Sequence, residues 1–282
     1  MILGASEIVI SPGVALSKPC LVDAKKQGIP LTGDVAMFGR LADAPMVAIT
    51  GSNGKSTVTA MLGHVAACER EGVSVGGNIG KPCLDSLSKS ANLYILELSS
   101  FQLELATNLP ALASVVLNLS PDHLDRYTSL DHYYGVKGNV YQNCKTAILN
   151  RQLQRKYLLP KDCSTISFGL DEPPAASDFG LDDRVICRGR KPLISEDDLP
   201  IEGEHNVLNC MATLALGEAV GLEMTSMLKN IKSFEGLPHR CELVKKINGI
   251  TFYNDSKATN VSSCVAAIES FAKEQNIILL LG

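Results

Sequence analysis

Short runs of β-branched and apolar residues alternate with helical patterns along much of the chain. The runs occupy residues 46–50, 73–77, 93–98, 114–120 and 146–150. Strands that alternate with helices form βαβ units, and these units build parallel sheets. The sequence therefore predicts an α/β fold in which helices flank a central, mostly parallel sheet.

A helix follows the first run directly. Its apolar residues recur at i, i+3, i+4, i+7 and i+8, at Val58, Met61, Leu62, Val65 and Ala66. This spacing places them on one helix face, and Gly72 provides a stop for the helix. A glycine-rich segment, residues 51–54, therefore joins a strand to a helix.

The pattern changes after residue 163. From 163 to 199, short apolar runs separated by turn sequences predict a small antiparallel flap attached to the sheet. Two helices are expected next, at 204–220 and 224–234, followed by a hairpin turn at Asn248-Gly249. A further helix then leads to a strand at 276–282.

Three parts are expected along the chain. Residues 1–45 hold about one and a half α/β repeats, too few to cover both faces of a parallel sheet. Residues 46–236 form the central domain, and residues 237–282 begin another. On this interpretation the chain corresponds to the middle of a longer protein.

The charge balance argues against nucleic acid as a partner. The chain has 26 Lys and Arg against 30 Asp and Glu, a net charge of −4, and no basic run that could follow a phosphate backbone. Nine cysteines without a CxxC pair indicate neither a disulfide framework nor a structural metal site, and they fit a reducing cytoplasm. The apolar runs fall short of the ~18 residues of a membrane span, so no membrane partner is expected.

The segment Gly51-Ser52-Asn53-Gly54-Lys55-Ser56 is a candidate cradle for a nucleotide triphosphate. Backbone N–H groups and a helix N-terminus can surround an anion there, with a lysine at the β/γ-phosphates and a hydroxyl on Mg²⁺. Only two residues separate Gly51 from Gly54, fewer than in the general GxxxxGK[ST] pattern. A simple glycine-rich turn is the alternative.

Polar residues follow three other runs. Glu97 lies near the end of the third run, where an open α/β sheet presents its ligands, and a carboxylate suits Mg²⁺; a helix cap or a solvated charge is the alternative. Asp122, His123 and Asp125 follow the fourth run and could serve a second metal or polarise a substrate oxygen, or Asp122 could cap a helix. Asn78, after the second run, could hold a substrate carboxylate or carbonyl, or be a turn residue.

Seven motifs occur in a fixed order: TGSNGKST, GGNIGKP, ELSSFQLE, PDHLDRY, GEHNVLN, GLPHR and YNDSKATN. In this order and approximate spacing they resemble the Mur ligase family over essentially the whole chain. The resemblance implies a central P-loop-type domain between partial Rossmann-like domains. Residues 1–45 would be a remnant of the domain that binds a UDP-linked substrate, and 237–282 the start of the amino-acid-binding domain.

The resemblance implies an ATP-dependent amide ligase. In this family ATP phosphorylates the terminal carboxylate of a UDP-linked precursor, and the amine of an amino acid attacks the acyl phosphate. A carboxylate resists nucleophiles, whereas an acyl phosphate carries a good leaving group, and cations must offset the charge that develops. The motifs most resemble the member that joins D-glutamate to UDP-N-acetylmuramoyl-L-alanine in peptidoglycan precursor synthesis. A cytoplasmic monomer is expected.

The resemblance also implies roles for individual residues. The nucleotide phosphates would be bound by Lys55 and by Gly51, Ser52, Asn53, Gly54, Ser56 and Thr57. Ser56 and Glu97 would hold one Mg²⁺ ion, and His123 and a carbamylated Lys137 a second. Lys55, Glu97, His123 and Lys137 would thus be the catalytic set. Without the family, Lys137 would be taken for a plain surface lysine.

Further contacts follow from the same resemblance. Two amides near the adenine and three residues around the ribose and phosphates are implied, namely Asn206, Asn209, Arg240, Asp255 and Lys257. Contacts with the UDP-linked substrate are implied for Ser11, Pro12, Gly13, Asn78 and His123. Taken alone, GEHNVLN would be a capped helix start.

Two other functions stay open. Members of the family have a longer N-terminal domain and a complete C-terminal domain, so the chain could be a catalytically inactive module that only binds nucleotide. A folylpolyglutamate-type ligase shares the fold and the acyl-phosphate chemistry, but GGNIGKP, ELSSFQLE and PDHLDRY argue against it.

Overall fold

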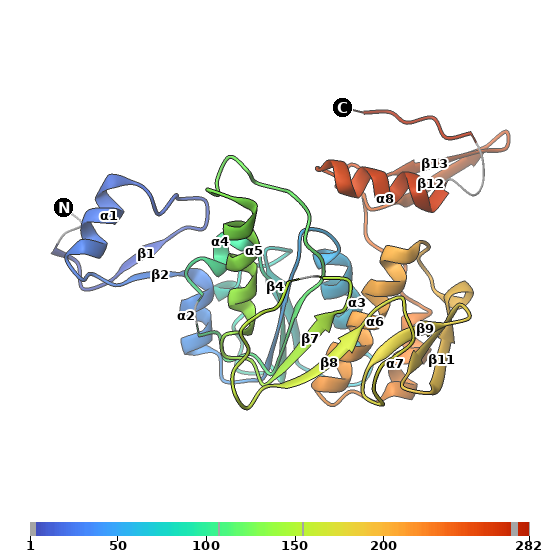
Figure 1. Cartoon of the computed structure of the whole chain (residues 1–282), viewed down its shortest axis with the longest axis horizontal. Helices are drawn as coiled ribbons and strands as arrows, with labels where there is room; N and C mark the ends of the chain where they lie inside the picture. Colours follow the sequence, from blue (N-terminus) through green and yellow to red (C-terminus); the bar gives the residue numbers. More distant parts are fainter. Residues whose placement is uncertain (1–3, 107, 154, 272–275, 282) are drawn as a thin grey trace.

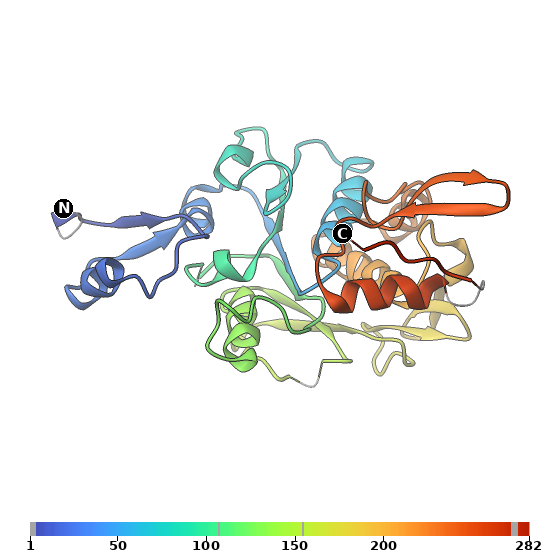
Figure 2. The same cartoon turned by 90° about the horizontal axis from the view of Figure 1, so that it is seen from above.

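The molecule, a computed structural model, has three parts (Figure 1). The structure describes residues 4–106, 108–153, 155–271 and 276–281. A small N-terminal part lies at one end, the central sheet and its helices form the body, and the C-terminal hairpin and helix lie above the far side of that body (Figure 2).

Within the described residues, nine strands form the central sheet, in the order β11-β10-β9-β8-β7-β6-β3-β5-β4. Six of them make a parallel section, as predicted: β4 (Val73–Gly77), β5 (Leu93–Glu97), β3 (Met46–Thr50), β6 (Ala113–Val116), β7 (Thr146–Asn150) and β8 (Ser164–Phe168). The remaining strands are β9 (Phe179–Asp182), β10 (Val185–Arg188) and β11 (Lys191–Ser195), which form an antiparallel meander.

The predicted flap is therefore only partly antiparallel. Strand β8 pairs in parallel with β7 along its whole length, and β9 touches β8 in parallel at one residue pair, Phe179 and Phe168. The meander continues the central sheet rather than standing apart from it.

Alternate residues of β3 face two different cores. Val47 and Ile49 pack in the core formed with α3 (Lys55–Ala67), α6 (Glu204–Ala219) and α7 (Met224–Ile231). Met46 and Ala48 pack in the core formed with α2 (Asp34–Leu41), α4 (Ser100–Leu103) and α5 (Leu130–Gly138). Since both faces of β3 are buried, its sequence is a continuous apolar run rather than an alternating one.

Strand β6 is shorter than the predicted run 114–120. It ends at Val116, which pairs with Thr50, the last residue of β3. Beyond Val116 the chain is bonded to the residues that follow β3, because the Ser52 N–H donates to the carbonyl of Asn118 at 3.0 Å. Residues 117–120 therefore form a loop that borders the candidate site.

The two terminal parts are small. Strands β1 (Ile8–Ile10) and β2 (Leu31–Gly33) pair in parallel beside α1 (Pro19–Lys26). Strands β12 (Glu242–Ile247) and β13 (Ile250–Asn254) form the predicted hairpin, and α8 (Val261–Phe271) follows. The turn uses positive φ angles of 50° at Asn248 and 80° at Gly249, as a type I′ turn requires.

The strand predicted at 276–282 is not formed over its described residues, 276–281. A strand needs a neighbouring strand to satisfy its backbone groups, and none of the described strands pairs with this segment. The described helices include none that is both long and apolar enough to cross a membrane.

Candidate nucleotide site at the carboxyl edge of the sheet

Four loops meet at one edge because β3, β4, β5 and β6 are parallel. The phosphate loop, residues 51–54, follows β3, and Asn78 follows β4. Glu97 is the last residue of β5, and residues 117–123 follow β6. The predicted phosphate, magnesium and substrate positions therefore lie at one edge of the sheet.

The phosphate loop leads directly into α3. Gly54 has a φ of +80°, a left-handed conformation that favours glycine, and α3 begins at the next residue, Lys55. Gly54 has no side chain that could cap the helix, so the N–H groups of the first turn are left to a ligand. This is the geometry expected of a phosphate cradle.

Not every N–H group of the loop is available, contrary to the sequence prediction. The Ser52 N–H donates to the carbonyl of Asn118 at 3.0 Å, and the Asn53 N–H donates to Asn118 Oδ1 at 2.8 Å. Asn118 Nδ2 donates in return to the Asn53 carbonyl at 2.9 Å. The short spacing between the two glycines thus produces a turn whose first half is held by the loop after β6.

Lys55 folds back over its own loop. Its ammonium donates to the carbonyls of Gly51 and Ser52 at 3.0 and 2.9 Å. Burial lowers its pKa, and the nearby carboxylates of Glu97 and Asp122 act in the opposite direction. A cation held only by carbonyl groups can transfer to phosphate oxygens.

Glu97 is buried and is held by Asn78. The Asn78 amide donates to Oε1 at 2.8 Å, and its backbone N–H donates to the Glu97 carbonyl at 2.8 Å. Oε2 is also buried, but it has no hydrogen-bond partner in the part of the chain described. An unpartnered buried carboxylate oxygen fits an Mg²⁺ ligand, because burial without compensation is costly.

Lys137 of α5 is a buried residue, not a surface lysine. It is 2% exposed, donates to the Gly51 carbonyl at 2.9 Å, and lies 4.7 Å from the centre of the Tyr133 ring. Burial, followed by the charge of Lys55, holds its pKa well below the ordinary value. A neutral amine is the form that can react with CO₂.

His123 lies on the exposed side of the same edge. Its Nδ1 is 3.7 Å from Asp122 Oδ1, and its ring centre is 4.8 Å from that of Phe101. The backbone at His123 has a φ of +52°, so the alternative helix start at Asp122 is not formed. The described residues contain no cluster of three or more His, Cys, Asp or Glu side chains suited to a metal.

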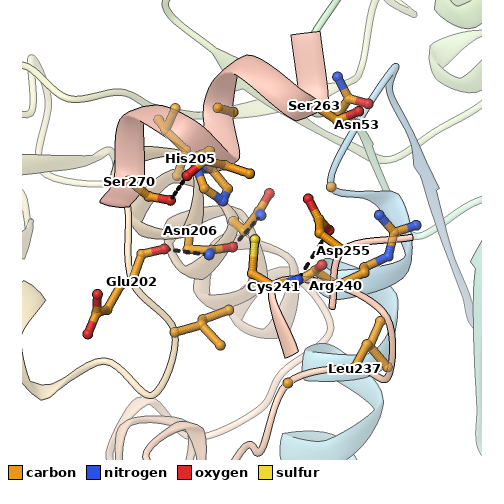
Figure 3. Close-up of a pocket in the computed structure, with 18 of the residues that line it drawn as sticks. Asn53, Glu202, His205, Asn206, Leu237, Arg240, Cys241, Asp255, Ser263 and Ser270 are labelled. Carbon is orange, nitrogen blue, oxygen red and sulfur yellow. Dashed lines mark hydrogen bonds between the residues drawn. The ribbon is translucent and has the colours of Figure 1, made fainter. Parts of the chain in front are cut away.

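A cavity of about 810 Å³ adjoins the phosphate loop (Figure 3). Its walls come from α6, from the loop after β6 and from the C-terminal hairpin and α8, and they include Asn206, Asn209, Arg240, Cys241, Asp255 and Ser263. Asn209 Nδ2 donates to Asn206 Oδ1 at 3.1 Å, and Asp255 Oδ1 accepts the Cys241 N–H at 3.1 Å. The cavity has the size and polarity of a small-molecule site.

The C-terminal part also reaches the phosphate loop. Arg240 donates to the hydroxyl of Ser56 at 3.1 Å. Together with Lys55 it places two cationic side chains beside the loop, a charge that suits an anion. The carboxylates of Glu97 and Asp122 act electrostatically on Lys55 and on Lys137.

Some predicted positions are not brought to this site. Lys257 is exposed and is not among the described residues that line the cavity. Ser11, Pro12 and Gly13 lie in the loop between β1 and α1, at the end of the molecule away from α8 (Figure 1). That loop is tied to the body at Val14, whose carbonyl accepts from Arg126 at 3.1 Å.

Sequence reasoning missed several residues of the site. Asn118 holds the phosphate loop, and His205 lines the cavity, where burial lowers its pKa. Tyr133 shares a 3.2 Å hydrogen bond with Ser52 and supports Lys137. The sequence did offer a signal for two of them. Asn118 lies near the end of a predicted strand, and His205 lies in the motif GEHNVLN.

A glycine turn between a buried strand and a helix, with a carboxylate on the neighbouring strand, places this protein among α/β proteins of the P-loop type. Residues 49–217 match the family model described as the Mur ligase middle domain. The chain belongs to the Mur ligase family.

Curated relatives agree with this assignment. The UDP-N-acetylmuramoylalanine–D-glutamate ligase of Nitrosococcus oceani is 45% identical over 100% of this chain, and that of Marinobacter nauticus is 44% identical over 99%. The chain spans 63% and 64% of the length of these two relatives.

Solved structures share the fold. A UDP-N-acetylmuramoyl-L-alanyl-D-glutamate–2,6-diaminopimelate ligase superposes with a TM-score of 0.68 at 17% identity, over 96% of this chain and 69% of that one. MurF from Acinetobacter baumannii gives 0.67 at 18% identity, over 97% and 70%.

Proposed function

We propose that this chain carries the nucleotide site of an ATP-dependent ligase that joins D-glutamate to UDP-N-acetylmuramoyl-L-alanine in peptidoglycan precursor synthesis. The observation that carries the proposal is the buried oxygen of Glu97, which has no partner among the residues the structure describes, at the same sheet edge as the phosphate loop and Lys55. The names of the two curated relatives described above supply the two substrates.

ATP would lie across the phosphate loop with its base in the cavity. Lys55 would exchange the Gly51 and Ser52 carbonyls for phosphate oxygens, and the first-turn N–H groups of α3 would add further donors. Arg240 would place a second cation beside the phosphates. Asn206, Asn209 and Asp255 line the cavity where the nucleoside would sit.

The same residues suit the chemistry of acyl-phosphate formation. The attacking carboxylate and the γ-phosphate both carry negative charge, so their approach needs fixed cations. Lys55 and Arg240 would supply such charge beside the loop. Mg²⁺, when bound, neutralises phosphate charge further, and Glu97 Oε2 and the Ser56 hydroxyl are the residues that would hold it.

His123 and Lys137 would hold a second Mg²⁺, with Lys137 as a carbamate. Burial favours the neutral amine that CO₂ requires. We expect ¹³C-bicarbonate to give a carbamate resonance in the wild-type chain and none in Lys137→Ala. If that variant folds and short carboxylic acids restore phosphate release, the carbamate assignment is supported. Absence of both the wild-type carbamate resonance and the rescue by carboxylic acids contradicts it.

The two ends would serve the other substrates. Residues 1–45 would belong to the part that binds the UDP-linked precursor, through Ser11, Pro12 and Gly13, with Asn78 and His123 nearer the reacting carboxylate. Residues 237–282 would belong to a Rossmann-like amino-acid-binding part, from which Lys257 would reach the nucleotide. We propose a cytoplasmic monomer.

The alternative is a module that binds nucleotide without catalysis, since the chain spans 63% of the first relative. Phosphate release from ATP that requires both D-glutamate and UDP-N-acetylmuramoyl-L-alanine would establish the ligase. ATP binding without affinity for the precursor would establish the module. A response to folate in place of the precursor would point to a folylpolyglutamate-type ligase.

A further inference from the structure

Asn53 in the phosphate loop is held by a part of the chain more than 200 residues away. Its Nδ2 donates to Ser262 Oγ at 2.9 Å, and its Oδ1 accepts from Asn260 Nδ2 at 3.0 Å. Both partners lie at the start of α8. The side chain of Asn53 is therefore fixed from the C-terminal part, while its backbone is fixed by Asn118.

The loop after β6 completes this junction. Ser262 Oγ donates to Ser120 Oγ at 3.0 Å, and Asn260 Nδ2 lies 3.4 Å from Asp122 Oδ2. Three segments thus meet at Asn53: the phosphate loop, the loop after β6 and the start of α8. All of these side chains are partly buried, where hydrogen bonds contribute more than at an exposed surface.

The hydrogen bonds of α8 determine how Asn260 is oriented. Asn260 Oδ1 accepts the backbone N–H of Ser263 at 2.9 Å, in the manner of a helix cap. A backbone N–H can only donate, so the oxygen of the amide must face the helix and its NH₂ must face Asn53. One side chain therefore both caps α8 and clamps the phosphate loop.

We propose that Asn260 is a positioning residue that couples docking of α8 to the geometry of the phosphate loop, acting through Asn53. Asn53 stands two residues before Lys55, so a change in its position moves the carbonyls that hold the lysine and the start of α3. Since coupling is reciprocal, polyphosphate bound at the loop would stabilise the docked position of α8. This inference rests on the proposed nucleotide site.

The test separates the clamp from the cap. Asn260→Ser keeps a good cap residue but is too short to reach Asn53, and Asn143→Ser, at an exposed amide bonded to the Asn108 carbonyl, is the matched control. We expect Asn260→Ser and Asn53→Ala each to weaken ATP binding by about fivefold or more. The double variant should lose no more affinity for ATP than the single variant that binds ATP more weakly.

Two further readouts distinguish positioning from general destabilisation. Adenosine lacks phosphates but shares the cavity that α8 helps to line, so it should lose less affinity than ATP in Asn260→Ser. Without nucleotide, backbone hydrogen exchange at Ser52 and Asn53 should accelerate in Asn260→Ser and stay unchanged in Asn143→Ser. Additive losses in the double variant, or equal losses for ATP and adenosine, would overturn the coupling.

Failure of the nucleotide site is recognised separately. If the wild-type chain binds neither ATP nor adenosine, the proposed function fails, and hydrogen exchange still decides the coupling. Unchanged exchange at Ser52 and Asn53 in Asn260→Ser overturns the inference whether or not nucleotide binds.

Discussion

The side-chain amide of Asn78 donates a 2.8 Å hydrogen bond to Oε1 of Glu97 and leaves Oε2 without a partner among the described residues. Their backbones are joined as well, because the Asn78 N–H donates to the Glu97 carbonyl at 2.8 Å. The carboxylate is therefore fixed through one oxygen and available through the other. Asn78 therefore positions the carboxylate of Glu97, and its contact with the substrate stays a prediction.

Replacing Asn78 by Ala should weaken the apparent affinity for Mg²⁺ in the presence of ATP. Partners that orient metal ligands are commonly worth about 10- to 100-fold in metal affinity, and we expect a loss in that range. Magnesium titration of ATP binding measures it. Asn92→Ala, which removes an exposed amide bonded to the Glu71 carbonyl, is the control. A loss below threefold would argue against the role given to Glu97.

Lys55→Ala should remove most of the affinity for the nucleotide phosphates. The ammonium of Lys55 is bonded to two carbonyls of the loop, and its loss would leave the phosphate charge poorly balanced. We expect at least tenfold weaker ATP binding, about 1.4 kcal/mol, by isothermal titration. Lys89→Ala, at an exposed position, should bind as wild type does. ATP affinity that is equal in both variants would contradict the cradle.

Gly54→Ala should be more destabilising than Gly28→Ala. Both glycines have similar positive φ angles, +80° and +75°, so each pays a comparable backbone cost of about 1–2 kcal/mol. At Gly54 a Cβ would also lie 2.6 Å from Asn209 Oδ1, whereas at Gly28 nothing lies within 4 Å. Urea unfolding of the two variants compares them directly. Equal losses of stability would show that Asn209 does not press against the loop.

The stability of the protein should depend on the protonation of Lys137. Burial lowers its pKa in the folded state, so between that pKa and the ordinary value of 10.5 the unfolded chain binds more protons. The free energy of unfolding must then rise with pH in this window. Lys137→Met should be more stable than wild type at the lower end of the window, by a margin that shrinks towards pH 10.5. Unfolding at several pH values in bicarbonate-free buffer tests this. A margin that is constant or that grows with pH contradicts it.

Much of the central sheet was predictable because its strands are buried on both faces. Continuous apolar runs such as the one at β3 mark parallel strands, and their ends locate the loops of the site. The glycines of the phosphate loop and the carboxylate of Glu97 followed from the same reasoning. Pairing between distant strands did not, so the parallel partner of β8 and the early end of β6 were missed.

The side-chain contacts of the site could not be predicted from local patterns. Lysine is seldom fully buried, so Lys137 looks like a surface residue in the sequence, and the contact of α5 with the phosphate loop was not predictable. The pairing of Asn53 with Asn260 joins residues 207 positions apart. Such contacts depend on how whole segments meet, which periodicity does not encode.

The hydrogen bonds between Asn118 and the phosphate loop have a thermodynamic consequence. Two backbone N–H groups of the turn are satisfied by the protein itself, so the turn is already ordered when a ligand arrives. Ordering a flexible loop on association consumes part of the available binding free energy. Because it is preorganised, this turn would retain that energy for binding a polyphosphate.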